Sequence, residues 1–236
     1  MTASSFLTRL GLVGAFALTL SLPVKAAPSQ LESAPQGWQN IQPAADLSGW
    51  TRVGIPPGHP LGRAQWHVDS PGTLVCDGDG GHEMLRYDLE IADCIFHVEF
   101  RFFPLSTNAN YNSGVYARNS ADGTVWYQVQ LTMDGGYLFG SGPVNGQTKH
   151  FNLKPSERRM KPAGEWNTVE LTAKGHTLTA WLNGAQTCSY PDCDVDKGYV
   201  AVESEGYKIE FRNIKLKELS PRPARVEEGK PVRQAQ

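Results

Sequence analysis

From Trp38 to Leu219 the chain alternates apolar and polar residues at intervals of two, which is the pattern of β-strands buried on one face. In residues 96–102, phenylalanine and valine fill one face, whereas histidine, glutamate and arginine fill the other. Helical periodicity never persists for more than a turn or two. The sequence therefore predicts an all-β domain over residues 38–219.

Each predicted strand has one apolar face, and turns rich in Gly, Pro, Asn and Asp separate the strands. Such strands bury their apolar faces by packing two sheets together, which predicts a two-sheet antiparallel β-sandwich of the jelly-roll type. Asn183-Gly184 predicts a tight hairpin turn. In the last strand the apolar residues change from odd numbers, at Ile209, to even numbers, at Ile214, and we expect a β-bulge near Arg212-Asn213.

The first 26 residues resemble a secretory signal peptide. Arg9 precedes the apolar run 10–22, and Val24-Lys25-Ala26 follows as a small-residue cleavage site. This run is shorter than the roughly 20 residues of a membrane helix, so we expect export to the periplasm or the extracellular space and no stable membrane span. An uncleaved anchor is the alternative. Residues 27–37 are expected to form a flexible leader and residues 220–236 a disordered tail.

Length and charge narrow the class of protein. The 236 residues suit one large β domain, and a hydrophobic content of 40% suffices for a packed core. With 22 basic and 24 acidic residues, the formal net charge is −2. Such a chain has no basic surface for a phosphate backbone, so nucleic acid is not an expected partner.

Export would allow the four cysteines to form disulfides. Cys188 and Cys193 bracket a turn-forming Ser-Tyr-Pro-Asp stretch, and we expect them to close a small loop. Cys76 and Cys94 share strand parity with core residues, which allows either a bridge between neighbouring strands or two buried free thiols. Because the chain has no Cys-x-x-Cys or paired-His spacing, the sequence predicts neither a metal site nor a cofactor.

Polar side chains opposite apolar strand neighbours form a candidate sugar site. Six residues share this position: Glu99, Arg101, Arg118, Gln128, Gln130 and Glu203. If their strands belong to one sheet, their carboxylate, amide and guanidinium groups project from one concave surface and can bond vicinal hydroxyls in pairs. Aromatic side chains such as Trp166 could cover a sugar ring. The alternative is an ordinary solvated sheet with cross-strand ion pairs, because alternation does not say which strands are neighbours.

Signatures of several enzyme classes are missing from the sequence. The chain has no Gly-x-Ser-x-Gly elbow, no phosphate-binding Gly-rich loop and no His-Glu-x-x-His zinc motif. It also lacks the Glu-x-Asp-x-x-Glu strand motif with which sandwich-fold glucanases place nucleophile and acid. Ordinary retaining glycoside hydrolysis of that kind is therefore disfavoured.

Seven short motifs occur in an order that resembles one bacterial family. They are Trp66-x-Val68, Val98-Glu99-Phe100-Arg101, Asn112-Ser113-Gly114-Val115, Tyr127-x-x-Gln130, Lys161-Pro162-x-Gly164-Glu165-Trp166-Asn167-Thr168, Trp181-Leu182-Asn183-Gly184 and Glu210-Phe211-Arg212-Asn213-Ile214. The family is that of the 3-keto-disaccharide hydrolases, which includes 3-keto-glucoside 1,2-lyases and 3-keto-2-hydroxy-glucal hydratases. The resemblance covers residues 38–219 and implies a sandwich like that of the concanavalin A-type lectins and glucanases.

The resemblance also implies chemistry on a sugar that another enzyme has oxidised at C3. The ketone acidifies the C2 proton, a base removes it, the C1 substituent leaves by β-elimination, and water can add back. From this chemistry we expect Glu99 as the base and Arg101 or Arg118 at the oxyanion. Glu203 is a further candidate carboxylate. The expected substrate-binding residues are Asn112, Tyr127, Gln128, Gln130 and Trp166.

Two departures from the family pattern bear on catalysis. Many relatives read Tyr-Glu-x-Gln where this chain has Gln128, so an amide stands in place of a carboxylate. Relatives also commonly read Gly-Leu-Gln-x-His-Gly where this chain has Glu203-Ser204-Glu205, so an imidazole is replaced. Either the acid–base groups have moved to Glu203 or Glu205, or the chain binds sugar without turning it over, as a lectin-like module does. A structural envelope protein without a sugar site is a third alternative.

Overall fold

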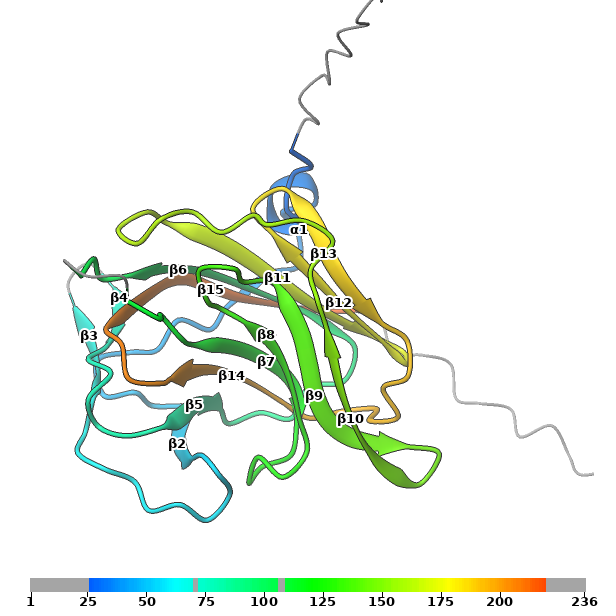
Figure 1. The fold of residues 1–236 in the computed structure, drawn as a ribbon, viewed down its shortest axis with the longest axis horizontal. Helices are drawn as coiled ribbons and strands as arrows, with labels where there is room; N and C mark the ends of the chain where they lie inside the picture. The colour runs from blue at the N-terminus through cyan, green and yellow to red at the C-terminus, as the bar shows by residue number, and fades with distance from the viewer. Residues whose placement is uncertain (1–25, 70–71, 106–108, 220–236) are drawn as a thin grey trace, which may run out of the picture.

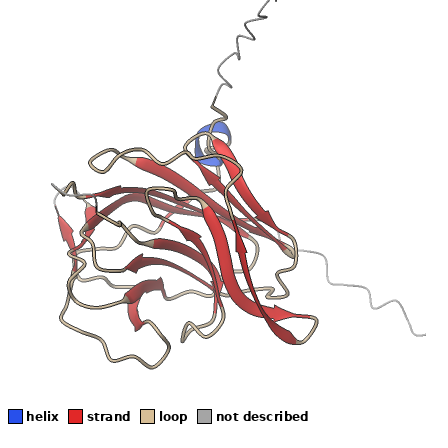
Figure 2. Cartoon of the chain, in the orientation of Figure 1, coloured by secondary structure: helices blue, strands red, loops and turns tan. Residues whose placement is uncertain are grey.

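The computed structural model describes residues 26–69, 72–105 and 109–219, and within them the chain forms two antiparallel β-sheets that pack face to face (Figures 1 and 2). The first sheet has eight strands: β1 (Gln39–Asn40), β3 (Trp66–Asp69), β4 (Thr73–Cys76), β6 (Cys94–Phe102), β11 (Asn167–Lys174), β12 (Thr177–Leu182), β13 (Ala185–Tyr190) and β15 (Ile209–Glu218). The second sheet has seven: β2 (Trp50–Gly54), β5 (Glu83–Tyr87), β7 (Gly114–Asn119), β8 (Trp126–Gln130), β9 (Tyr137–Val144), β10 (Gln147–Leu153) and β14 (Tyr199–Ser204).

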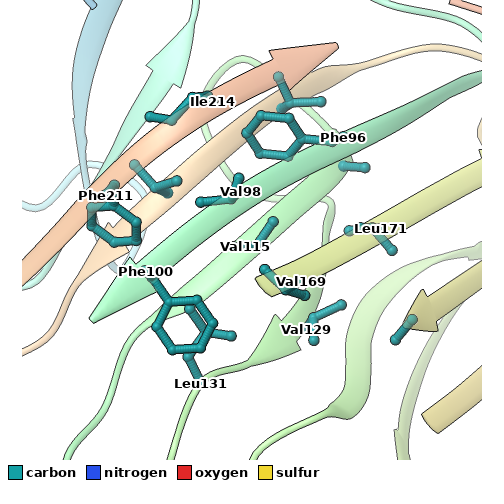
Figure 3. Packing of buried hydrophobic residues seen from close by; sticks show 14 of the residues in the cluster. Phe96, Val98, Phe100, Val115, Val129, Leu131, Val169, Leu171, Phe211 and Ile214 are labelled. Atoms are coloured by element: carbon teal, nitrogen blue, oxygen red, sulfur yellow. The ribbon is translucent and has the colours of Figure 1, made fainter. Parts of the chain in front are cut away.

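The apolar faces predicted from the alternation meet between the sheets. Figure 3 shows Phe96, Val98 and Phe100 of β6 facing Val115 of β7 and Val129 of β8, and all five side chains are completely buried. The strand order of the second sheet is β10-β9-β8-β7-β14-β5-β2, so β7, β8 and β14 lie at its centre. The fold is the predicted all-β jelly-roll sandwich.

Two local predictions are confirmed. Asn183 and Gly184 join β12 to β13, and both have positive φ angles, 43° and 101°, as a tight hairpin turn of this kind requires. The pairing of β15 with β6 shifts register between Arg212 and Lys215, where Asn213 has a φ of 51°. This bulge explains why the apolar parity of the last strand changes.

The expected flexible leader instead forms a short helix, α1 (Gln30–Ser33), that is fixed to the first sheet. Ser29 caps the helix together with Glu32, and the backbone amides of Gln30 and Leu31 donate to the carboxylate of Glu170 at 2.7 and 3.1 Å. Glu170 is buried on β11 and also contacts His97, with 2.9 Å between Oε1 and Nδ1. Local sequence does not predict this contact, because Glu170 lies some 140 residues after Gln30 in the chain.

The predicted signal peptide, except for Ala26, and the predicted tail lie outside the described residues. Among the residues that are described, none of the helices is both long and apolar enough to cross a membrane.

The predicted disulfide between Cys188 and Cys193 is wrong for this structure, in which all four cysteines are free thiols. The Cys188 thiol donates to the backbone oxygen of Gly136 at 3.3 Å, whereas the Cys193 thiol lies 3.8 Å from that of Val195. Cys76 and Cys94 pair with opposite ends of β15, so the bridge considered for them is also absent. Burial raises the pKa of both the Cys76 and the Cys94 thiol to about 12, which makes them inert core residues.

Candidate functional site

A pocket of about 440 Å³ opens on the outer, concave face of the second sheet. Its polar side chains come from four neighbouring strands or the residues next to them: His82, Asn112, Tyr116, Asn119, Gln128, Gln130, Glu203 and Glu205. Four of the sequence-predicted site residues, Asn112, Gln128, Gln130 and Glu203, therefore lie together.

Strand alternation places these side chains on the outer face. Val115, Val129 and Val202 are completely buried in the core, so their strand neighbours Tyr116, Gln128 and Glu203 must point the other way. Because the strands pair β8-β7-β14, these three side chains converge although they are up to 87 residues apart in sequence.

Glu203 is the centre of the polar cluster. It is only 2% exposed, yet its carboxylate accepts three hydrogen bonds. Tyr116 Oη donates to Oε1 at 2.5 Å, Gln128 Nε2 donates to Oε2 at 2.5 Å, and His82 Nε2 lies 2.9 Å from Oε1. Burial, followed by the charge of Glu203, raises the pKa of Tyr116 well above its usual value, so Tyr116 remains a donor. The cluster thus holds a carboxylate that would otherwise be costly to bury.

His82 and Glu205 lie beside Glu203 at the mouth of the pocket, and each is about one-third exposed. His82 Nε2 is 3.8 Å from Glu205 Oε2. Burial alone would lower the pKa of His82, but the hydrogen bond and charge of Glu203, together with Glu205, raise it above 6.5. Burial and the charge of Glu203 raise the pKa of Glu205. The cluster therefore favours the protonated form of His82 and makes the carboxylate of Glu205 more basic than an isolated one.

The start of β5 holds His82 in place. Its neighbour Glu83 is buried and accepts hydrogen bonds from Arg52 Nε at 2.9 Å and from Trp66 Nε1 at 2.7 Å. Ser204 of β14 pairs with Glu83, so Glu205 continues alongside His82. The register of β5 and β14 brings His82 and Glu205 together, so each strand supplies one of the two titratable groups at the pocket mouth.

His82, Glu203 and Glu205 are also the donor set with which a divalent cation could be held. One imidazole nitrogen and two carboxylate oxygens lie within 4.8 Å of one another, a combination suited to Zn²⁺, Mn²⁺ or Fe²⁺. Tyr116 and Gln128 would then orient Glu203 through their hydrogen bonds to its carboxylate, as such donors orient metal-bound carboxylates. A cation would have to replace the proton between His82 and Glu203.

Asn112 and Asn119 add amide groups to the pocket. Asn112 accepts a hydrogen bond from Gln130 and bonds to the carboxylate of Glu205. Asn119 is fully buried; its Oδ1 accepts a hydrogen bond from the backbone amide of Tyr127, and within the described part of the chain its Nδ2 has the Met84 sulfur as its one partner, at 3.6 Å. Sulfur is a weak acceptor, so this N–H group is available to a ligand.

Arg118 was expected in the site but does not line it. Its φ of 61° breaks the alternation of β7, and Asn119 takes the outward position that parity assigned to Arg118. The Arg118 guanidinium instead bonds to Asp93 Oδ1 at 2.6 Å and to the backbone oxygen of Val195 at 2.5 Å. It is a buried structural ion pair.

The opposite wall of the pocket is apolar. Trp126 and Phe139 meet edge to face with ring centroids 5.1 Å apart, and the loop Ile55-Pro56-Pro57 after β2 closes the side next to them together with Met84. Such a wall can cover the face of a ring while the polar cluster binds its edge.

Glu99 and Arg101 lie on β6 of the other sheet, and Trp166 lies just before its strand β11, so the expectation that all the polar strand faces share one surface is wrong. On the exterior of the first sheet, Glu99 accepts from Arg212 Nε at 2.7 Å and from Asn213 Nδ2 at 2.9 Å. Arg101 bonds to Glu210, and its guanidinium lies 4.6 Å from the centre of the Trp166 ring. These contacts brace the bulge of β15.

Tyr127 was expected to bind substrate, but it points into the core and is 1% exposed. Conversely, sequence reasoning missed His82 and Asn119. His82 belongs to none of the seven motifs, and only the pairing of β5 with β14 reveals its role. Asn119 faces the pocket because of a bulge in β7, which no residue type in the sequence predicts.

Comparison with known proteins identifies the family. Residues 37–217 match the sequence profile of the family described as the 3-keto-alpha-glucoside-1,2-lyase-like domain. The chain belongs to this family. Membership assigns it to carbohydrate-active or carbohydrate-binding proteins and agrees with the resemblance of the seven motifs. No curated protein sequence matches the chain.

Solved structures show the same fold as this member of the 3-keto-glucoside lyase-like family. A protein from Parabacteroides distasonis ATCC 8503 that carries the name of a glycosyl hydrolase has a TM-score of 0.57 and 18% identity, and the match covers 83% of this chain and 100% of that one. The carbohydrate-binding module CBM66 from Bacillus subtilis has a TM-score of 0.54 and 14% identity, with 72% and 96% covered. A β-1,3-1,4-glucanase from a mouse hindgut metagenome has a TM-score of 0.50 and 9% identity, with 77% and 98% covered.

The two departures from the family pattern meet at one place in this structure. The amide of Gln128 on β8 donates to the carboxylate of Glu203 on β14. Glu205 lies 3.8 Å from the imidazole of His82 on the adjacent strand. The pocket therefore holds one imidazole and two carboxylates around the two positions.

Proposed function

We propose that the chain is a lyase or hydratase for glycosides oxidised at C3, with Glu205 as the base and His82 as the acid. The observation that supports this proposal is the contiguous chain Tyr116–Glu203–His82–Glu205 at a pocket of sugar size. It puts a carboxylate of raised pKa, which suits a base, next to an imidazole of raised pKa, which suits an acid.

The proposed reaction begins at C2 of the sugar. The Glu205 carboxylate takes the C2 proton, and the electron pair of the C2–H bond forms a C2=C3 bond while the C3 oxygen becomes an oxyanion. The oxyanion then reforms the ketone, the electron pair moves to C1=C2, and the C1–O bond breaks. His82 gives its proton to the leaving oxygen. Hydration reverses the pattern: His82 accepts a proton from water, whose oxygen adds at C1, and Glu205 returns the proton to C2.

The remaining residues have supporting roles. The buried Glu203 carboxylate stabilises the His82 imidazolium and fixes its orientation, as Tyr116 and Gln128 hold Glu203 from two sides. The Asn119 Nδ2–H is the donor proposed for the C3 oxyanion, because a weak sulfur contact is all that it would give up. Asn112 holds Glu205, and the Trp126–Phe139 wall covers the ring.

Proton abstraction and elimination can be tested separately. Methyl 3-keto-glucoside in D₂O should lose its C2 proton signal in NMR faster with the protein than without it, and an enone with a C1=C2 bond should follow. Glu205→Gln should abolish both signals, whereas His82→Gln should retain C2 exchange and lose elimination. If neither signal exceeds the protein-free rate, the catalytic proposal is rejected.

A second candidate is a non-catalytic carbohydrate-binding module, and the amide at Gln128 favours it, since an amide cannot accept a proton as a carboxylate does. This function predicts calorimetric binding of a 3-keto-glucoside or an oligosaccharide to the unmodified chain, with no deuterium incorporation at C2. Binding should then be unaffected by Glu205→Gln, which removes a charge but keeps the shape.

We also propose that the protein is exported to the periplasm or the extracellular space by the segment up to Ala26. N-terminal sequencing of protein recovered from those fractions should begin at Ala27 or Pro28. Recovery of the chain from the cytoplasm with Met1 still present would contradict export.

A further inference from the structure

Gln65 is a buried glutamine that contacts both strands of the acid–base cluster without lining the pocket. It lies just before β3 of the first sheet and is 1% exposed. Its Oε1 accepts the backbone amide of Gly80 at 2.9 Å and the hydroxyl of Ser204 at 3.0 Å. Its Nε2 donates to the backbone oxygen of Gly81 at 2.9 Å. One amide therefore joins the end of β14 to the loop before β5.

The two segments that Gln65 joins carry the acid–base groups. Gly81 directly precedes His82, and Ser204 lies between the two glutamates of the cluster. Strand alternation directs both glutamates into the pocket and Ser204 away from it, where its side chain is completely buried. Gln65 can therefore act on the cluster only through the backbone that it holds.

The loop 77–81, which leads into His82, needs contacts of this kind. Three of its five residues are glycines, and Gly78 and Gly81 have positive φ angles of 80° and 103°. Glycine has more backbone freedom to lose on folding than any other residue, so such a loop keeps one conformation only when outside contacts fix it. Two of the three hydrogen bonds of Gln65 supply such contacts.

The residue after Gln65 acts on the other side of His82. Trp66 Nε1 donates to the buried carboxylate of Glu83 at 2.7 Å. Consecutive residues at the start of β3 thus fix the chain before His82 and after it. The imidazole is held in place from the sheet that lies beneath the pocket.

We propose that Gln65 is a positioning residue, which sets the distance between the imidazole of His82 and the carboxylate of Glu205 through the backbone next to each. This inference rests on the proposed function, in which Glu205 takes the C2 proton and His82 gives a proton to the leaving oxygen. Both groups must then meet one sugar in a fixed geometry. A displaced His82 slows the elimination more than the C2 exchange, because exchange needs Glu205 alone.

The test is Gln65→Met, which keeps the size of the side chain and removes its hydrogen bonds. Each bond corresponds to about twofold to tenfold, so kcat for release of methanol from methyl 3-keto-β-glucoside should fall about tenfold to 100-fold. KM should change less than about twofold, since the lining of the pocket is intact, and C2 exchange in D₂O less than about threefold. Ser204→Ala removes one bond and a single oxygen atom, and it should lower kcat about twofold to tenfold.

Gln42→Met is the matched control. Gln42 is a half-buried glutamine whose Oε1 accepts the backbone amide of Ile214 on β15 at 3.1 Å, so the variant makes the same chemical change away from the pocket. It should lower Tm and leave both kcat and the ratio of C2 exchange to methanol release unchanged.

The ratio of C2 exchange to methanol release decides the outcome. If Gln65→Met lowers Tm as the control does but leaves that ratio unchanged, the positioning role is overturned and the proposed function stands. If Gln65→Met does not fold, Ser204→Ala decides in the same way. Absence of both exchange and release with the unmodified protein would reject the proposed function, and the positioning role with it.

Discussion

Replacing Glu203 by glutamine should remove most of the proposed lyase activity while leaving the shape of the pocket unchanged. The carboxylate accepts hydrogen bonds from Tyr116 and Gln128 and holds His82, all within 2.9 Å. An amide offers one acceptor oxygen, so at least one of the three donors then faces an N–H group. Hydrogen bonds to a charged group contribute about 1.5–3 kcal/mol, which corresponds to a loss of roughly tenfold to 150-fold in kcat.

The pH profile distinguishes this explanation from simple damage to the fold. Glu203 raises the pKa of His82, so its loss should lower that pKa and move the alkaline limb of the kcat profile toward lower pH. The acidic limb follows Glu205, whose pKa the charge of Glu203 raises; that limb should also move toward lower pH. Both shifts are measured by release of the C1 substituent from a 3-keto-glucoside across pH 4–9, with Tm recorded for each variant.

Glu99→Gln is the matched control for this experiment, because it makes the same chemical change on the exterior of the other sheet. Glu99 is paired with Arg212 at a partly exposed site, and we expect a stability loss of about 1 kcal/mol or less with full activity. If Glu99→Gln abolished turnover and Glu203→Gln did not, the assignment of the site to the second sheet would be refuted.

Three further predictions concern pH, stereochemistry and metal. Both His82 and Glu205 have raised pKa values in the folded state, so the free energy of unfolding should fall as pH rises. The fall due to Glu205 begins at pH 4.5 and ends above its folded pKa, and the fall due to His82 begins at pH 6.5 and ends above its folded pKa. Thermal unfolding of His82→Gln across this pH range should lack the fall that is due to His82. His82 and Glu205 lie 3.8 Å apart on one wall, so they can reach a C2 proton and a C1 oxygen that are on the same side of the sugar ring. The β-anomer of a glucoside has this arrangement, so the 3-keto-β-glucoside should be cleaved faster than the α-anomer. Faster cleavage of the α-anomer would contradict the assignment of His82 and Glu205. Zn²⁺ bound to His82, Glu203 and Glu205 should inhibit turnover by displacing the proton of His82, and EDTA should restore it. Inhibition should weaken at lower pH, where protons compete with the cation. Activation by Zn²⁺ would contradict this prediction.

The alternation of the sequence was sufficient to predict the sandwich, because each strand has one face that must be buried. It also assigned the outward positions of Gln128, Gln130 and Glu203 correctly, because β8 keeps an unbroken register with β9, and β14 with β5, at these residues. Strand parity, however, is the same for every sheet of a sandwich. It could not tell that Glu99 and Arg101 belong to a sheet whose exterior faces the other way.

The remaining errors come from contacts between distant parts of the chain. A positive φ at Arg118 moves Asn119 into the pocket, and no single residue type predicts such a bulge. His82 becomes a candidate only when the register of β5 and β14 brings it next to Glu205. Local sequence therefore determined which face each side chain occupies, whereas the partners of each side chain depended on strand order.

The docking of α1 determines which face of the protein stays accessible when the chain is linked to another molecule or to a surface. The leader lies on Glu170 of the first sheet, and the described chain ends just after β15 of the same sheet. Both points of attachment thus belong to the layer that does not carry the pocket. A surface, a fusion partner or an affinity matrix linked beside α1 or directly after β15 would leave the concave face, with its proposed substrate site, directed outward.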